Sequence, residues 1–140
     1  MTRYLADTSI WSWANNAPGS AIASRLAERV ERDEVVTTPV VVLETLHRAR
    51  SDKEYELVRD ALFGDLELIP ITRAGGERAL AVQRGLAFEG HGNHRRPATD
   101  FLVAAAAEEA GSDVTLWFYD KDLEVICEHT GQPFEVEKTA

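Results

Sequence analysis

The sequence predicts an α/β fold in which helices cover both faces of a central parallel sheet. Short β-branched or aromatic runs alternate with helical stretches along the whole chain, and this alternation is typical of parallel strands joined by crossover helices. The run Val114–Tyr119 has little polar content, as expected of a strand that is covered on both faces. A length of 140 residues suits one compact domain. We therefore expect a single three-layer α/β/α domain over residues 1–140.

The first third of the chain predicts two strands, each followed by a helix. Tyr4–Ala6 is a short apolar run that ends at Asp7–Ser9, three residue types that favour a helix N-cap. A further amphipathic helix follows Ser20, because apolar residues recur four apart at Ile22, Leu26 and Val30. Val35–Thr37 is β-branched, and the proline that follows Thr38 suits the first position of a helix over 40–50.

The rest of the chain continues the alternation of strands and helices. Gly64 and Gly111 follow two of the helical stretches and mark their ends. The stretch between the last long helices contains two glycines, two histidines and two arginines without periodicity, which indicates a loop. The expected elements are helix 51–63, strand 66–71, helix 72–88, loop 89–97, helix 99–110, strand 114–119, helix 120–129 and strand 134–136.

Charge and cysteine content limit the classes of function. Aspartate and glutamate number 24 against 15 lysines and arginines, a net charge of -9, which argues against a protein that coats nucleic acid by bulk attraction. A phosphate substrate then needs local positive charge, and a divalent cation bound by carboxylates supplies it. Cys127 is the only cysteine, which excludes an intrachain disulfide and a thiolate zinc cage. Asp7 interrupts the apolar core that a signal peptide would need, so we expect a cytoplasmic protein that does not enter the membrane.

Three acidic residues fall where a parallel sheet places its ligand site. Asp7 and Asp120 each come directly after a predicted strand, and Asp100 opens a helix after a long loop. In open α/β sheets, ligands bind at the carboxyl ends of the strands. Each acid also suits a plain helix-capping role. Asp122 lies two residues after Asp120, and we expect one of them to be the cap and the other to face the site.

Glu44 is a lone acid in the apolar block Val40–Leu46. Burial of an unpaired carboxylate is costly, so this side chain needs a cation. A metal ion is one partner. His47 and Arg48, three and four residues further along the helix, are the alternatives.

Four segments of the chain together resemble the four acidic motifs of PIN domains, and most of all those of the VapC toxins of bacterial toxin–antitoxin pairs. The resemblance covers nearly the whole chain in order and spacing. It implies Mg²⁺ or Mn²⁺ held by carboxylates, endonucleolytic cleavage of RNA, a homodimer and inhibition by a cognate VapB antitoxin. The segments are Leu5-Ala6-Asp7-Thr8-Ser9, Val42-Leu43-Glu44, Thr99-Asp100-Phe101-Leu102-Val103-Ala104-Ala105 and Tyr119-Asp120-Lys121-Asp122-Leu123.

The resemblance also implies roles for individual residues. The catalytic acids by match are Asp7, Glu44, Asp100 and Asp120, and the metal ligands are Asp7, Asp100, Asp120 and Asp122. Ser9 is a candidate site hydroxyl that contacts the substrate. Leu123 stands where phenylalanine is frequent in the family, which leaves open whether Asp120 or Asp122 lies nearer the metal.

Two arginines in the predicted loop, Arg95 and Arg96, are candidates to grip RNA phosphates. The alternative is an exposed loop with solubilising charges. The tryptophans Trp11, Trp13 and Trp117 are interpreted as core or dimer contacts rather than platforms that stack on bases.

Two other classes of function stay open. An aspartate after the first strand resembles the nucleophile of metal-dependent phosphatases and phosphoryl-transfer enzymes, although the haloacid-dehalogenase pattern has a second aspartate where this chain has Ser9. A non-catalytic binding module whose acids are only caps is the third hypothesis. A binding module is expected to show no thermal shift with Mn²⁺, and a phosphatase is expected to release phosphate from small esters without cutting RNA.

Overall fold

The computed structural model describes residues 1–138, in which five strands form one sheet of order β3-β2-β1-β4-β5. Every neighbouring pair of strands is parallel, so the predicted fold class is confirmed. The elements are β1 (Arg3–Ala6), α1 (Thr8–Asn16), α2 (Ala21–Glu31), β2 (Val35–Thr37), α3 (Pro39–Leu46), α4 (Asp52–Phe63), β3 (Glu67–Leu68), α5 (Arg73–Glu89), α6 (Ala98–Ala110), β4 (Val114–Phe118), α7 (Lys121–Thr130) and β5 (Phe134–Val136).

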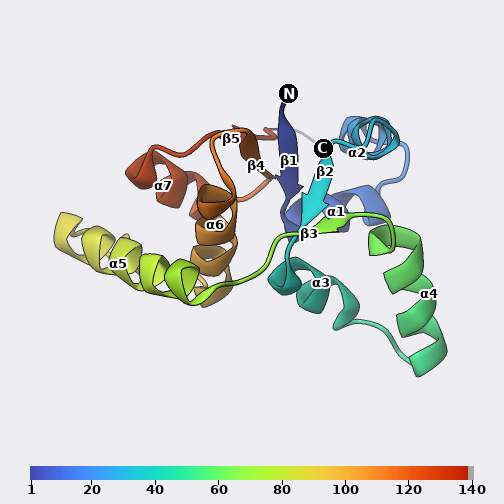
Figure 1. Cartoon of the computed structure of the whole chain (residues 1–140), viewed down its shortest axis with the longest axis horizontal. Helices are drawn as coiled ribbons and strands as arrows, with labels where there is room; N and C mark the ends of the chain where they lie inside the picture. The colour runs from blue at the N-terminus through green and yellow to red at the C-terminus, as the bar shows by residue number, and fades with distance from the viewer. Residues whose placement is uncertain (139–140) are drawn as a thin grey trace.

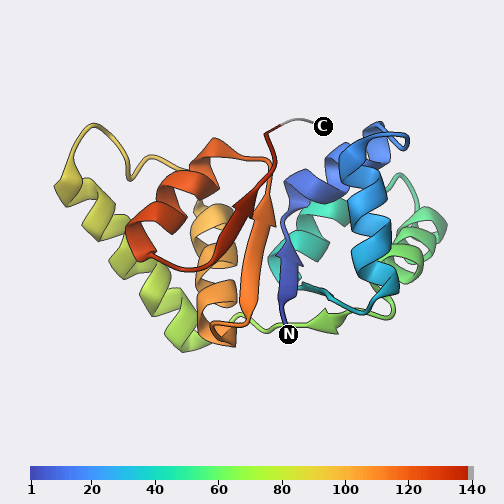
Figure 2. The ribbon, with the colours of Figure 1, turned by 90° about the horizontal axis from the view of Figure 1, so that it is seen from above.

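The helices form the two outer layers. Figure 1 labels the elements, and Figure 2 shows the sheet standing between one group made of α5, α6 and α7 and another made of α1 to α4. Each β-strand is followed by at least one helix before the next strand, as right-handed crossovers of parallel strands require. The predicted three-layer arrangement is therefore present.

The strand nearest the N-terminus lies at the centre of the sheet. In β1, Tyr4 pairs with Val35 of β2 on one side, and Leu5 pairs with Leu116 of β4 on the other. Leu5 and Leu116 are fully buried, because helices cover both faces. The carboxyl ends of β1 and β4 consequently lie side by side, which fixes the start of α1 next to the start of α7.

Trp117 of β4 anchors the core of the sheet. Its side chain is fully buried, and the Arg29 guanidinium of α2 lies 4.4 Å from its ring. Arg29 also pairs with Glu135 of β5 at 2.7 Å. The predicted core role of Trp117 is confirmed, as is that of Trp11, which is 5% exposed. Trp13 is 37% exposed and packs against the ring of Tyr119.

Two elements are shorter than predicted. The helix expected over 40–50 ends at Leu46, and residues 47–50 connect it to α4, whose N-cap Ser51 accepts a hydrogen bond from the Glu54 amide at 3.1 Å. The strand expected over 66–71 is reduced to Glu67–Leu68. The last backbone hydrogen bond to the neighbouring strand β2 is donated by the Ile69 amide to the Thr37 carbonyl at 2.7 Å. Pro70 follows and has no N–H with which to continue the strand.

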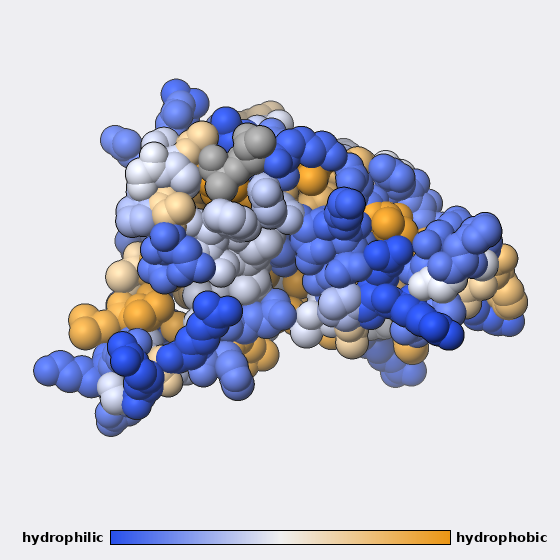
Figure 3. All heavy atoms as spheres, turned by 180° about the vertical axis from the view of Figure 1, so that it is seen from behind, coloured by the Kyte–Doolittle hydropathy of each residue, from blue (hydrophilic) through white to orange (hydrophobic). Residues whose placement is uncertain are grey.

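The surface is mostly hydrophilic on the face shown in Figure 3, where apolar side chains gather in separate patches. No helix within residues 1–138 is both long and apolar enough to span a bilayer.

Candidate active site

The predicted acids meet at the carboxyl edge of the sheet. Asp7 follows β1 and Asp120 precedes α7, while Asp100 lies in the first turn of α6 and Glu44 in α3. The ends of β1 and β4 and the segment that enters α6 share the upper edge of the molecule in Figure 2. Parallel strands thus bring together acids that lie far apart in the sequence.

Asp7 is both a helix cap and a member of the site. Its Oδ2 accepts hydrogen bonds from the Ser9 amide at 3.1 Å and from the Ser9 hydroxyl at 2.8 Å. The same hydroxyl accepts a hydrogen bond from the Tyr119 amide at 3.0 Å. Ser9 therefore ties the start of α1 to the end of β4 and fixes the Asp7 carboxylate. A contact of Ser9 with substrate stays a prediction.

Asp100 is the third residue of α6 and does not cap the helix, whose N-cap is Pro97 without a side-chain hydrogen bond. It is 7% exposed, and its Oδ2 has no hydrogen-bond partner among the described residues. Burial raises the pKa of Asp100 to about 8, assisted by repulsion from Asp7, Asp120 and further acids. A buried carboxylate oxygen without a donor is suited to bind a cation.

Asp120 is the cap of α7, and its Oδ1 accepts a hydrogen bond from the Asp122 amide at 2.8 Å. Burial raises the pKa of Asp120. Asp100, Asp120 and Asp122 each offer a carboxylate oxygen, and these oxygens all lie within 4.8 Å of one another. The expectation that one of the two C-terminal acids is a cap is correct, and both of them belong to the cluster.

Glu44 lies at the border of this cluster. Its Oε1 accepts a hydrogen bond from the Thr8 hydroxyl at 2.7 Å. In the part of the chain that the structure describes, no ion pair joins Glu44 to His47 or Arg48, so the intrahelical alternative does not apply. Desolvation raises the pKa of Asp7 to about 6, and repulsion from Glu44 adds to this rise.

The donor set fits a divalent cation. The three grouped carboxylates, Asp100, Asp120 and Asp122, offer the hard oxygen ligands that Mg²⁺ and Mn²⁺ prefer. Burial is the main cause of the raised pKa values of Asp100 and Asp120, and repulsion from neighbouring acids adds to it. A cation between them removes this repulsion and provides the buried Asp100 oxygen with a partner.

The two loop arginines, Arg95 and Arg96, differ in exposure and in side-chain contacts. The Arg96 side chain is 20% exposed and donates to Asp122 Oδ1 at 2.7 Å, and its Nε donates to the Asn93 carbonyl at 3.1 Å. Arg95 is exposed. The sequence pointed to both residues as phosphate contacts but missed the ion pair of Arg96. It also missed the Thr8 hydroxyl on Glu44, since a threonine after an acid carries no distinctive signal.

Comparison with known proteins identifies the architecture. A model of the PIN domain family matches residues 4–128. The chain belongs to the PIN-domain family. It is 35% identical, over 133 residues, to Ribonuclease VapC18 of Mycobacterium tuberculosis, covering 94% of this chain and 93% of that protein, which places it with the VapC members of the family.

Solved structures agree with this PIN fold. The VapBC2 complex of Rickettsia felis, bound to a DNA fragment from its promoter, matches with a TM-score of 0.75 at 15% identity, over 98% of this chain and 100% of that chain. Mycobacterium tuberculosis VapC20, described as a toxin that cleaves the sarcin-ricin loop, matches with a TM-score of 0.59 at 19% identity, over 86% and 92% of the two chains. The matched range includes the four acids that meet at the carboxyl edge of the sheet, Asp7, Glu44, Asp100 and Asp120.

Proposed function

We propose that this PIN domain is a Mg²⁺- or Mn²⁺-dependent endoribonuclease and the toxin of a VapBC-type toxin–antitoxin pair. The observation that carries the proposal is the grouping of Asp100, Asp120 and Asp122, with Asp7 and Glu44 beside them, in a chain 35% identical to a named ribonuclease. We assign the metal-holding role to Asp7, Asp100, Asp120 and Asp122. The catalytic set is Asp7, Glu44, Asp100 and Asp120.

The side chains of the site are held in fixed positions, as phosphodiester hydrolysis requires. A divalent cation held here supplies charge neutralisation for the phosphate and activates a water molecule. Ser9 and Thr8 hold the Asp7 and Glu44 carboxylates by hydrogen bonds of 2.8 and 2.7 Å. These two fixed carboxylates can orient a water molecule and accept its proton.

Positive charge for the RNA backbone comes from the loop before α6. Arg95 is exposed and free to contact a phosphate, whereas Arg96 reaches the acids through Asp122. A guanidinium placed at the rim of an acidic cluster can hold a phosphate next to the cation. We therefore assign Arg95 and Arg96 to substrate binding.

The cleavage assay compares the same substitution at an aspartate inside the site and at an aspartate outside it. With single-stranded RNA, cleavage is expected in Mn²⁺ and absent in EDTA, and Asp100→Asn is expected to lower the rate at least about 100-fold. Asp113→Asn is the matched control, because Asp113 lies outside the site and pairs with Arg3 at 2.9 Å. Cleavage by Asp100→Asn at the wild-type rate would remove that residue from the site. Release of phosphate from small esters without RNA cleavage would favour a phosphatase.

The binding partners that we propose follow from the membership of this chain in the PIN-domain family. We propose a homodimer that a VapB-like antitoxin inhibits, in agreement with the VapBC complex whose fold this chain shares. Coexpression with the product of the neighbouring upstream gene is expected to yield a stable complex without ribonuclease activity. A monomeric chain that forms no such complex would contradict this assignment.

A further inference from the structure

A cavity lies directly beside the acidic cluster, between α1, α3 and α4. Its volume is about 240 Å³, and Figure 1 shows the three helices together on one side of the sheet. Two of its lining residues are Thr8 and Glu44, which share a hydrogen bond of 2.7 Å. A molecule that fills the cavity therefore contacts the border of the active site.

The lining combines polar groups with an apolar wall. Asn15 of α1 offers an amide, Arg48 a guanidinium and Glu54 of α4 a carboxylate, while Val58 and Leu62 provide apolar surface. The lining holds both signs of charge, since Glu44 and Glu54 accompany Arg48, and Glu54 also pairs with Arg50 at 3.7 Å, so the cavity carries no excess of positive charge for an anion such as phosphate. A neutral, planar ligand that carries both hydrogen-bond donors and acceptors fits this chemistry better.

Two buried polar atoms in the lining residues lack partners. Among residues 1–138, neither the Trp11 Nε1 nor the Thr45 hydroxyl has a hydrogen-bond partner. Trp11 is 5% exposed, and its ring packs edge-on against Phe63 at 5.0 Å, so the indole is held in place. Unpaired buried polar groups are rare in folded proteins and call for an explanation. Both atoms lie beneath the cavity wall, and the fixed indole of Trp11 gives a ligand a rigid surface to pack against.

We propose that this cavity binds one unpaired nucleobase of the RNA, next to the phosphodiester that is cut, and so selects the cleavage site. The inference rests on the proposed ribonuclease function. Sequence-specific recognition of RNA acts mostly on bases that are splayed out of a helix and bonded at their edges. Arg48, Asn15 and Glu54 provide donors and acceptors for such an edge, and they line the same cavity as Glu44.

The experiment reads the bases around each cut. A pool of single-stranded RNA with random sequence is cleaved in Mn²⁺, and the ends are sequenced. Wild type is expected to prefer one base at a position flanking the cut. Asn15→Ala and Arg48→Ala are expected to reduce this preference about 10-fold, and Ala49→Leu, which fills the cavity, is expected to do the same.

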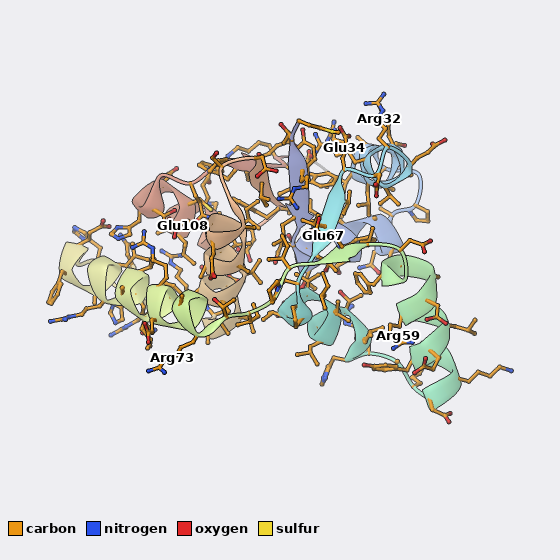
Figure 4. The ribbon with its side chains drawn as sticks, in the orientation of Figure 1. Arg32, Glu34, Arg59, Glu67, Arg73 and Glu108 are labelled. Atoms are coloured by element: carbon orange, nitrogen blue, oxygen red, sulfur yellow. The ribbon has the colours of Figure 1, made fainter. Side chains whose placement is uncertain are left out.

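Two control variants separate the cavity from the rest of the surface. Asn16→Ala removes the neighbouring amide, which is exposed and does not line the cavity. Arg73→Ala removes an arginine of α5 that is labelled in Figure 4 and does not line the cavity, and whose described ion pair is with Glu77 of the same helix. Both controls are expected to keep the wild-type base preference. Melting temperatures confirm that every variant is folded.

The outcomes are distinct. An unchanged base preference in Asn15→Ala, Arg48→Ala and Ala49→Leu would overturn the proposal, as would a wild-type enzyme that cuts without any preference. Loss of antitoxin binding in these variants with an unchanged base preference would assign the cavity to the protein partner and also overturn it. A wild-type protein that cuts no RNA with Mn²⁺ refutes the ribonuclease function itself, and the base pocket with it.

Discussion

Replacement of Asp100 by asparagine is expected to stabilise the metal-free protein at neutral pH. Asparagine keeps the shape of the side chain and removes its ionisation. Burial and neighbouring acids raise the pKa of Asp100 from 3.8 to about 8, so the folded state keeps a proton that the unfolded chain has already released. The free energy of unfolding of wild type therefore falls as the pH rises from about 4 to about 8.

The size of the effect follows from this pKa. One pKa unit corresponds to about 1.4 kcal/mol. Compared with a side chain that stays neutral, the ionisable Asp100 lowers the free energy of unfolding of the metal-free protein. The loss is on the order of 4 kcal/mol at pH 7 and about 2 kcal/mol at pH 5. Asp100→Asn is expected to exceed wild type by these amounts. The difference narrows in acid because the unfolded chain then also keeps its proton.

Urea unfolding in EDTA, followed by tryptophan fluorescence at one fixed protein concentration, measures both values. Asp113→Asn is the control with the opposite sign, because Arg3 lowers the pKa of the exposed Asp113 carboxyl. Its contribution is present above the ordinary pKa and lost as the pH falls. Equal stability of wild type and Asp100→Asn at pH 7, or a difference that does not narrow at pH 5, would refute the reasoning. With Mn²⁺ added, wild type is expected to gain more stability than Asp100→Asn.

Three further predictions concern other parts of the molecule. Asp7→Asn is expected to lower Mn²⁺-dependent RNA cleavage at least about 100-fold with the fold intact, because asparagine caps helices as well as aspartate does; a wild-type rate would place Asp7 outside the site. Arg96→Ala is expected to tighten Mn²⁺ binding several-fold in calorimetry, because it removes the guanidinium that pairs with Asp122 and competes with the metal ion. Arg95→Ala is its control, and equal effects would contradict this role of the ion pair. Burial raises the pKa of Cys127 to about 12, so this thiol is expected to resist thiol reagents until urea unfolds the protein. Rapid labelling of the native state would show that α7 opens.

Local patterns predicted the order of the elements and the edge at which the acids meet. Asp7 and Asp120 follow strands directly, and the topology of a parallel sheet then places them together whatever the details of packing. Residue type alone could not decide whether Asp100 is a cap or a site acid. That distinction depends on its place as the third residue of α6 and on burial by distant parts of the chain.

The contacts that sequence could not supply are those between side chains far apart in the chain. Arg96 and Asp122 are 26 residues apart, and Thr8 and Glu44 are 36 apart. Such pairs depend on how loops and helices pack, which no periodic pattern records. The end of α3 at Leu46 also lacked a signal in the sequence, because no glycine or proline follows Leu46 before Gly64.

The central position of β1 has a consequence for folding during synthesis on the ribosome. The first strand to be synthesised, Arg3–Ala6, has its second neighbour in β4, which begins at Val114. A nascent chain that ends before Asp120 lacks two acids of the cluster and the helix that carries Asp122. The acidic cluster therefore cannot assemble on a nascent chain until β4 and the start of α7 have been synthesised.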